Sequence, residues 1–379
     1  SHVVRRPAGG DDVVDTGFIV MNTVTYPTFT RLLRELGVRT QPAEMSMSVS
    51  CRGCGLEYAG ARGPAGLFAQ RASTRNPRYL RMLTEIPRFH RAARKLLATA
   101  TGGDEPLRDF LSRNRFSDYF VDHFAIPMVA CVWSCSPGIA LDYPARYLFT
   151  FLDNHGMLRI WGSPQWQTVV GGSREYVNRI AEALPDVRLS SRVTAIHRDA
   201  DRVTVTTGSG AIDNFDAAVI ATHPNQALSM LTNATDLERK LLGAFTYSPN
   251  PTQLHSDEST LPRSRRARAS WNFRTQSCGG SAAEPVAVTY DMNHLQSIDG
   301  PSRYLVSLNS TAEIDPSLVR EQMSYAHPQY TPTSVEAQRR LPELNSPRLA
   351  FAGAYHGWGF HEDGARSGLT AARALGSRW

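Results

Sequence analysis

The sequence predicts a combined α/β and α+β fold in which two domains are interleaved along the chain. With 379 residues, the chain is long enough for two to three domains of ordinary size. Strand and helix patterns of the α/β type open the chain, return after Val169 and close it, with a mostly helical stretch and a strand-rich stretch between them. One α/β domain is therefore expected from three segments, 1–42, 160–235 and 346–379. Residues 43–159 and 236–345 form the second domain, with helices and a mixed or antiparallel sheet.

The first half of the chain is predicted to be mostly helical after its opening strand. An extended apolar run over 12–22 is followed by an amphipathic helix over 26–36, which Gly37 ends in the usual way for glycine. The apolar spacing is helical from 43 to 153, and the clearest helix spans 77–100. Shorter helices are expected over 107–111 and 143–152.

Strands dominate the second half. A helix ending at Leu184 follows Val169–Ser173, and the apolar run Ala217–Thr222 is predicted to be a buried strand. The chain closes with strand Leu349–Ala352, a glycine-rich turn and a helix over 362–375. Further strands are predicted over 187–189, 193–197, 203–206, 269–274, 285–292 and 304–308.

The charge pattern argues against a nucleic-acid partner. All but two of the 41 basic residues are arginine, the exceptions being Lys95 and Lys240, and 35 acidic residues leave a net charge of +6. This excess is small for the length, and it is scattered rather than gathered into one arm. The longest apolar stretch, 125–133, is far shorter than the roughly 18 residues of a membrane helix. We expect no transmembrane segment, while peripheral membrane contact stays open.

Five cysteines are too few, and odd in number, for a disulfide framework, so a cytoplasmic location is expected. Cys51 and Cys54 are spaced like a metal or redox pair, but a zinc site needs two further ligands. The other close pair, Cys131 and Cys135, lies four residues apart in an apolar run, which is helical spacing. The sequence favours ordinary packed thiols and predicts no metal site, with a metal or redox pair as the alternatives.

The strongest candidate site is the glycine-rich turn between the last strand and the last helix. Gly353, Gly357 and Gly359 allow the backbone to approach a ligand closely. The helix that follows offers amide N–H groups and the positive end of its dipole to negative charge. The alternative is a tight strand-to-helix connection in which Gly364 and Gly368 assist helix packing.

This region resembles the C-terminal FAD motif of the flavin amine oxidase superfamily. Its Gly-Phe-His-Glu-Asp-Gly run, 359–364, followed by Ser367-Gly368-Leu369, is similar to a subgroup of FAD/NAD-binding oxidoreductases associated with cyclopropane or methyl fatty acid synthesis. The resemblance covers essentially the whole chain, in the expected order. It also rests on residues 15–22, 151–156, 164–177, 221–228, 270–272 and 289–293.

The resemblance implies a discontinuous Rossmann-like FAD-binding domain and assigns residues to the cofactor. Gly353 and the turn Gly359, Phe360, His361 and Glu362 would lie along the flavin. The last helix would point its N-terminus at the flavin pyrimidine carbonyl and stabilise the reduced anion. The other implied contacts are Thr16, Gly17 and Phe18 at the isoalloxazine, Val193 at the adenine, and Ala221 and Thr222 beside the cofactor.

The sequence also departs from the superfamily pattern. No G-x-G-x-x-G occurs, although the superfamily begins with a strand, that turn and a helix. We therefore expect the FAD-binding domain to lack its first βαβ unit at the N-terminus, and the 379-residue chain to retain FAD weakly. Neither Lys95 nor Lys240 lies where the superfamily holds a lysine near flavin N5, which disfavours amine oxidation. His255 is the nearest titratable candidate for that role.

Two aromatic residues of the turn, Tyr355 and Phe360, could form walls over the flavin, with core packing as an equal alternative. Tyr355 and His255 are the candidate catalytic residues, and NADPH is a candidate electron donor. The sequence thus predicts a FAD-dependent oxidoreductase acting on a C–C or methylene bond of a lipid acyl substrate. The alternative is a non-catalytic remnant that binds a lipid or a partner.

Overall fold

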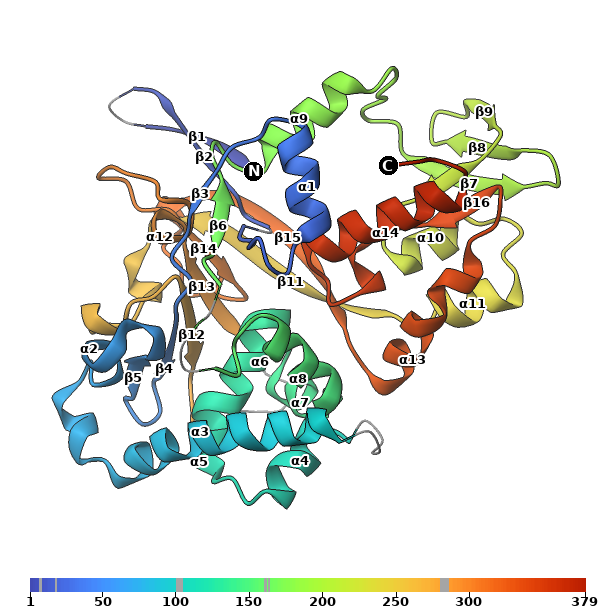
Figure 1. Cartoon of the computed structure of the whole chain (residues 1–379). Helices are drawn as coiled ribbons and strands as arrows, with labels where there is room; N and C mark the ends of the chain where they lie inside the picture. Colours follow the sequence, from blue (N-terminus) through green and yellow to red (C-terminus); the bar gives the residue numbers. More distant parts are fainter. Residues whose placement is uncertain (7–8, 18, 100–104, 160–161, 163, 280–285) are drawn as a thin grey trace. The chain divides into compact units, whose positions relative to one another are not determined.

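The computed structural model describes residues 1–6, 9–17, 19–99, 105–159, 162, 164–279 and 286–379 (Figure 1). The chain divides into two compact units, each assembled from three separate segments. Unit 1 comprises Ser1–Thr23, Arg39–Glu175 and Ser248–Gln329. Unit 2 comprises Val24–Val38, Tyr176–Tyr247 and Tyr330–Trp379.

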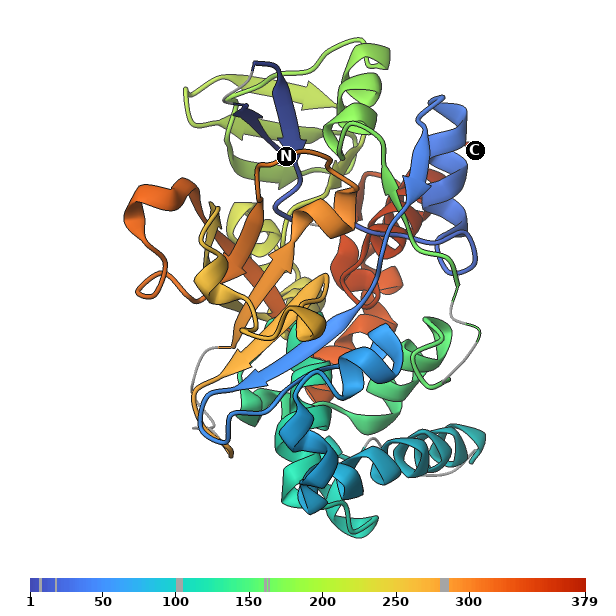
Figure 2. The same cartoon turned by 90° about the vertical axis from the view of Figure 1, so that its left-hand side faces the viewer.

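A seven-stranded mixed sheet is the centre of unit 1 (Figure 2). Its strand order is β15-β11-β14-β13-β12-β4-β5. β4 runs parallel to β12, whereas the pairs β11/β14, β14/β13, β13/β12 and β4/β5 are antiparallel. The bounds are β4 Met47–Cys51, β5 Glu57–Ala59, β11 Thr246–His255, β12 Trp271–Thr275, β13 Ala287–Asp291, β14 Leu305–Leu308 and β15 Val319–Gln329.

The helices of unit 1 pack around an aromatic core centred on Phe89. This fully buried ring contacts five other phenylalanine rings, with centroid distances that range from 5.4 Å to Phe149 up to 6.1 Å to Phe110. Such edge-to-face packing adds to the burial of apolar area. The helices are α2 Gly63–Leu67, α3 Pro77–Ala98, α4 Leu107–Arg113, α5 Asp118–Phe120, a π-helical turn Val121–Ala125, α6 Ile126–Trp133, α7 Pro137–Asp142 and α8 Ala145–Asn154.

Unit 1 is completed by two short antiparallel pairs and one short helix. β1 (His2–Arg5) pairs with β2 (Asp11–Val14), and β3 (Thr40–Pro42) pairs with β6 (Gln167–Val169). Helix α12 (Met292–Gln296) follows β13 directly.

Unit 2 joins two small sheets through one apolar core. β10 (Ala218–Ile220) and β16 (Leu349–Phe351) form a parallel pair, and β7 (Val193–Arg198), β8 (Val203–Thr207) and β9 (Ile212–Phe215) form an antiparallel sheet. Ile196, Ile220 and Phe351 contribute to the same buried cluster. The helices are α1 Pro27–Glu35, α9 Arg174–Ala183, α10 Pro224–Met230, α11 Asp236–Leu242, α13 Pro332–Arg340 and α14 His361–Ala374.

The predicted fold class is confirmed, because α/β and α+β elements both occur and each unit is discontinuous. The helix over 26–36 is observed as α1, and Gly37 has a φ of +66° just beyond it. The helix over 77–100 is α3, and the closing helix is α14.

Three local predictions are wrong. Residues 187–189 form no strand, and Leu189 is 83% exposed. The helical stretch expected from residue 43 begins instead with β4 and β5, because β4 pairs with the distant strand β12. The run Ala217–Thr222 is not fully buried, since Val219 on β10 is 41% exposed.

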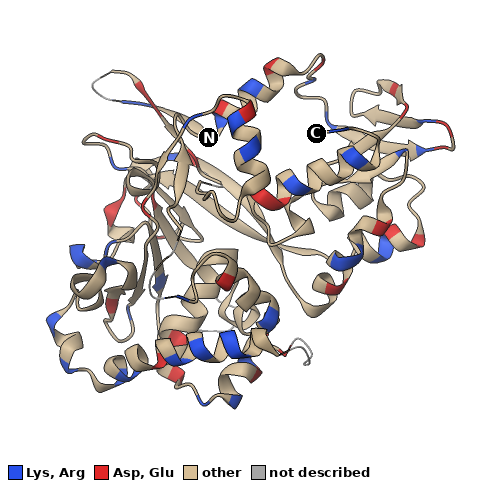
Figure 3. Ribbon diagram, viewed as in Figure 1, with Lys and Arg blue, Asp and Glu red and all other residues tan. Residues whose placement is uncertain are grey.

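None of the helices in the described part of the chain combines the length and the apolarity that a membrane crossing requires. Lys and Arg, and likewise Asp and Glu, are spread over both units (Figure 3).

Candidate functional site

The candidate site lies in unit 2 at the carboxyl ends of the parallel strands β10 and β16. The Ala352 amide donates to the Ile220 carbonyl over 3.0 Å, so both strands end at the same level. Ala221 and Thr222 follow β10 and are exposed, and Gly353 follows β16. The carboxyl edge of parallel strands is where α/β folds bind ligands.

Only glycine fits at the start of the turn. Gly353 has a φ of +154°, and a Cβ there would lie 2.5 Å from the Tyr355 ring. The Ser367 hydroxyl accepts a hydrogen bond from the Gly353 amide over 2.9 Å, which fixes the turn to α14.

Asp363 organises the end of the turn. Its Oδ2 accepts hydrogen bonds from the amides of Trp358 (3.0 Å) and Phe360 (3.1 Å), and its Oδ1 pairs with Arg366 at 2.9 Å. A Cβ on Gly357 would lie 1.9 Å from Oδ1, so the backbone and the carboxylate are in close contact. Burial raises the pKa of Asp363 to about 6, against the opposing effect of these partners.

The N-cap residue of α14 is Phe360, whose side chain carries no acceptor for the first-turn amides, and Gly359 immediately before it has a φ of +94°. Ser, Thr, Asp or Asn usually occupies this position and accepts from the first-turn amides. Together with the helix dipole, such a terminus favours a negatively charged or carbonyl ligand.

Two polar atoms of the turn are buried without a hydrogen-bond partner among the described residues. They are the Tyr355 hydroxyl and Nε2 of His356. Burial raises the pKa of Tyr355 and lowers that of His356 to about 4, so both are neutral at pH 7. The backbone on either side of His356 is held by Gln338 of α13, whose Nε2 donates to the carbonyls of Tyr355 (2.8 Å) and Gly357 (2.6 Å).

The Tyr355 ring packs in the apolar core of unit 2, with its centroid 5.4 Å from that of Phe245. Val193, the first residue of β7, packs against the same core. The structure therefore places Val193, Tyr355 and the end of β10 in one compact unit.

His361 contacts helices α1 and α9, with its ring centroid 4.6 Å from that of Phe29 on α1, and Glu362 contacts α1. Nε2 of His361 lies 3.2 Å from the Tyr176 hydroxyl, and burial lowers its pKa to about 3. The Glu362 carboxylate accepts hydrogen bonds from the amides of Thr28 (3.1 Å) and Phe29 (2.9 Å). Its side chain thus caps the N-terminus of α1, while its backbone belongs to the first turn of α14.

The remaining predicted residues belong to unit 1. The Thr16 hydroxyl lies 2.6 Å from that of Tyr325, and Gly17 is exposed just beyond β2. Phe18 lies outside the described residues. The predicted site residues therefore lie in both units, and most of those in unit 2 belong to the turn or to the neighbouring strand ends.

His255 ends β11 in the seven-stranded sheet and is fully buried. Its Nδ1 accepts from the Asp257 amide over 3.0 Å, so Nε2 carries the proton and donates to the Ser307 hydroxyl over 2.8 Å. Burial lowers its pKa to about 4, which makes the imidazole neutral at pH 7. The Ser307 hydroxyl lies 2.6 Å from that of Thr289 and extends this buried network.

Sequence reasoning missed the residues that shape the turn from other positions: Gln338, Asp363 and Ser367. Asp363 carries a usable signal, because an acidic residue three positions after an N-cap commonly accepts from the N-cap amide. Gln338 offers no signal, since its role depends on α13 packing beside the turn.

The sequence profile described as flavin containing amine oxidoreductase matches residues 1–251. The chain belongs to this family. No protein with curated annotation matches it significantly.

Solved structures of this fold cover nearly the whole chain. A putrescine oxidase bound to putrescine is 12% identical, with a TM-score of 0.66, over 99% of this chain and 90% of the oxidase. Cyclohexylamine oxidase from Brevibacterium oxydans is 15% identical, with a TM-score of 0.64, over 96% and 87%. A fatty acid isomerase from P. acnes that produces CLA is 14% identical, with a TM-score of 0.66, over 99% and 89%. At these identities the likeness establishes the fold.

Proposed function

We propose that the protein is a FAD-dependent oxidoreductase whose flavin lies along the turn Gly353–Glu362. Family membership implies a flavin cofactor. The observation that carries its placement is a pair of polar atoms, on Tyr355 and His356, that are buried without a hydrogen-bond partner among the described residues. They lie beside a helix whose N-cap residue, Phe360, has no side-chain acceptor. Buried polar groups normally have partners, so a turn that leaves two without any in the described chain fits a bound polar ligand.

The residues of the turn fit a planar, partly anionic ligand. The first-turn amides of α14 would donate hydrogen bonds to it, and the dipole of this 14-residue helix would favour negative charge there. Gly353 and Gly359 both have a positive φ, which glycine adopts without steric penalty, and a glycine lets the backbone approach a ligand closely. When bound, the flavin supplies the acceptor for a hydride.

The remaining cofactor contacts follow the family pattern within each unit. Ala221 and Thr222 are exposed at the end of β10, as residues beside a ligand would be, and Val193 would hold the adenine through its backbone. Thr16 and Gly17 are proposed to face the isoalloxazine. His255 is proposed to transfer protons through Ser307, because Nε2 donates to the Ser307 hydroxyl and Nδ1 accepts from the Asp257 amide.

The substrate class is proposed to be a lipid acyl chain oxidised or reduced at a C–C or methylene bond. The support is the resemblance to the fatty-acid subgroup, the fold shared with a fatty acid isomerase, and the positions of the lysines. Lys95 lies in α3 and Lys240 in α11, so neither stands on a sheet strand. A comparison of lipid extracts by mass spectrometry, with and without the protein, tests this. A product seen only with amines would contradict it.

The placement of the flavin is tested with two glycine variants of the protein expressed from its complete coding region. Gly359→Leu is expected to abolish flavin absorbance. Leucine is strained at the φ of +94° that Gly359 adopts, and its side chain would occupy space proposed for the flavin. Gly364→Ala is the matched control: a Cβ there has no neighbour within 4 Å. Equal flavin content in both variants would refute the placement.

A further inference from the structure

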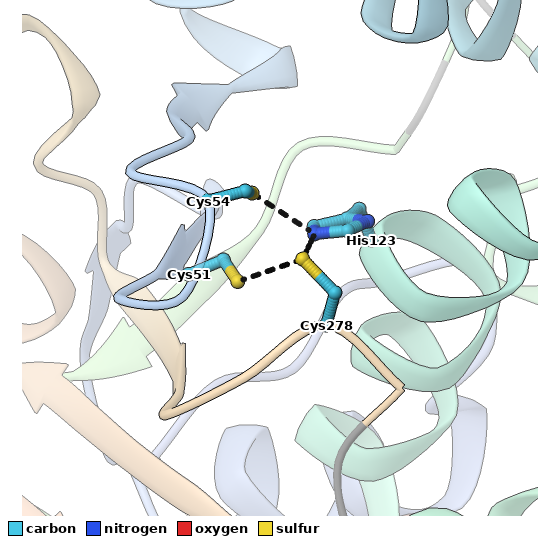
Figure 4. A group of neighbouring side chains, drawn as sticks. All are labelled: Cys51, Cys54, His123 and Cys278. Carbon is cyan, nitrogen blue, oxygen red and sulfur yellow. Dashed lines mark hydrogen bonds between the residues drawn. The ribbon is translucent and has the colours of Figure 1, made fainter.

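Four metal-ligating side chains from three distant parts of unit 1 converge on one point. Cys51, Cys54, His123 and Cys278 offer ligand atoms that all lie within 4.8 Å of one another (Figure 4). The thiols and the imidazole point toward a common centre from three different segments. None of these residues belongs to the turn discussed above.

The parallel pairing of β4 with β12 brings the cysteines together. Cys51 is the last residue of β4 and lies opposite Thr275, the last residue of β12. The chain segments that follow the two strands therefore leave the sheet side by side, at the carboxyl ends of β4 and β12. The Arg52 amide donates to the Thr275 carbonyl over 2.9 Å and extends the pairing past the strand ends.

Two glycines allow the loops to approach. A Cβ on Gly53 would lie 2.9 Å from the Ser277 backbone, so only glycine permits this contact between the two loops. Gly55 has a φ of +72°, and its amide donates to the Cys51 carbonyl over 2.9 Å. The Cys51-x-x-Cys54 segment thus forms a tight turn with the spacing that supplies two ligands to structural zinc sites.

Three of the six distances between ligand atoms match the edges of a tetrahedral zinc site. Zn–S bonds of about 2.3 Å and Zn–N bonds of about 2.0–2.1 Å give S···S edges of about 3.8 Å and S···N edges of about 3.5 Å. The observed distance between the Cys51 and Cys278 sulfurs is 3.7 Å. Nε2 of His123 lies 3.4 Å from the Cys54 sulfur and 3.6 Å from that of Cys278.

The imidazole of His123 is oriented for ligation. Its Nδ1–H donates to the Tyr119 carbonyl over 3.0 Å, which leaves the lone pair of Nε2 facing the sulfurs. The Tyr119 ring stacks on it with a centroid distance of 4.1 Å, and the Tyr58 hydroxyl donates to the His123 carbonyl over 2.7 Å. A backbone carbonyl on the second ring nitrogen is the usual outer contact of a metal-bound histidine.

The Tyr119 hydroxyl is a second indication. It is buried without a hydrogen-bond partner among the described residues, and the ring that carries it stacks on His123. A neutral thiol is a weak acceptor, whereas a metal-bound thiolate accepts well. Deprotonation of the cysteines on metal binding would offer this hydroxyl an acceptor.

A disulfide and a cluster of several irons fit less well. The 3.7 Å between Cys51 and Cys278 is far above the roughly 2.05 Å of a disulfide, and all the cysteines are free. Four ligands within 4.8 Å of one another suit a single ion. By contrast, Cys131 and Cys135 are both buried in the helical part of unit 1 and fit the packed thiols that the sequence favoured for all five cysteines.

We propose that Cys51, Cys54, His123 and Cys278 bind one structural Zn²⁺. Four protein ligands close the coordination sphere, so the ion ties the ends of β4 and β12 to the helical turn Val121–Ala125 and leaves no position for substrate. Binding displaces three thiol protons and changes no oxidation state. The site does not depend on the proposed flavin chemistry.

The test is the metal content of the purified protein, measured by elemental analysis together with cobalt substitution. One zinc per chain is expected, and Co²⁺ added to the reduced apoprotein should give the absorption of tetrahedral thiolate coordination. Cys278→Ser and His123→Ala are expected to lose the zinc, and His123→Cys, which restores a fourth ligand, should regain it. Cys131→Ala is the matched control outside the cluster and should retain one zinc.

Three results would overturn the proposal. The first is protein that lacks zinc and gives no thiolate absorption with Co²⁺ after reduction. The second is iron in place of zinc as the bound metal. The third is a disulfide between Cys51 and Cys278 found by mass spectrometry without reductant. Because His123→Cys keeps four ligands, its regain of zinc distinguishes lost coordination from lost folding.

Discussion

Replacing Asp363 by asparagine is expected to change how the stability of the protein depends on pH. Asp363 is 2% exposed, and burial raises its pKa to about 6 from an ordinary value of 3.8. The native state therefore holds a proton between these values that the unfolded chain has lost. The contribution of Asp363 to stability is fully present below pH 3.8 and is lost as pH rises through 6.

The size of the effect follows from the shift of about two pKa units. At about 1.4 kcal/mol per unit, the wild type loses about 3 kcal/mol in total relative to Asp363→Asn as the pH rises from below 3 to above 7. The slope is greatest between pH 4 and 6. The asparagine side-chain oxygen can still accept from the Trp358 and Phe360 amides, so the turn is expected to keep its conformation.

The assay is urea unfolding of both proteins at half-unit steps of pH, with the difference in unfolding free energy plotted against pH. The unfolding free energy of the wild type minus that of Asp363→Asn should fall steadily between pH 4 and pH 6 and level off above pH 7. A difference that is flat, or that rises with pH, would refute the burial argument for Asp363. Either result would also argue against the close contact between the Asp363 carboxylate and Gly357.

Three further substitutions test the packing by chemical denaturation. Glu362→Ala should destabilise by about 2 kcal/mol, because two amides of α1 lose a charged cap, and Glu362→Gln should recover part of this; equal losses would contradict the capping role. Gly357→Ala should destabilise by more than 1 kcal/mol, since its Cβ would lie 1.9 Å from Asp363, while Gly364→Ala should be neutral or stabilising by up to about 1 kcal/mol. The reverse order would argue against the turn geometry. Phe89→Ala should cost about 3–5 kcal/mol through a cavity among five aromatic rings; a loss under 1 kcal/mol would mean that this core is not tightly packed.

Local signals were sufficient for much of the fold. The end of α1 follows from Gly37, and α3 follows from its apolar periodicity. The strand and turn before α14 were visible because β16 is apolar throughout and glycines follow it. The limits of the two domains stay a prediction.

Features that depend on distant partners could not be read from the sequence. β15 is an 11-residue strand with no fully buried residue, so its sequence lacks an apolar pattern. β4 and β5 are short, and their strand structure depends on pairing with β12. The two further ligands of Cys51 and Cys54 could not be recognised because they are distant along the chain. His123 lies 69 positions from Cys54, and Cys278 lies 227 positions from Cys51.

The turn itself was predicted from the resemblance, and its supporting contacts were not. Glu362 was assigned to the flavin, and the structure places its carboxylate on the N-terminus of α1. Tyr355 was assigned equally to a flavin wall or to core packing, and its ring lies in the core while its hydroxyl has no partner in the described chain. Such dual roles arise when a binding turn is also part of a core.

The proposed function depends on a bound flavin. The most direct measurement is the amount of FAD released by heat denaturation from protein expressed with its complete coding region and purified after FAD is supplied. One FAD per chain is predicted. Colourless protein that releases no FAD would contradict the account.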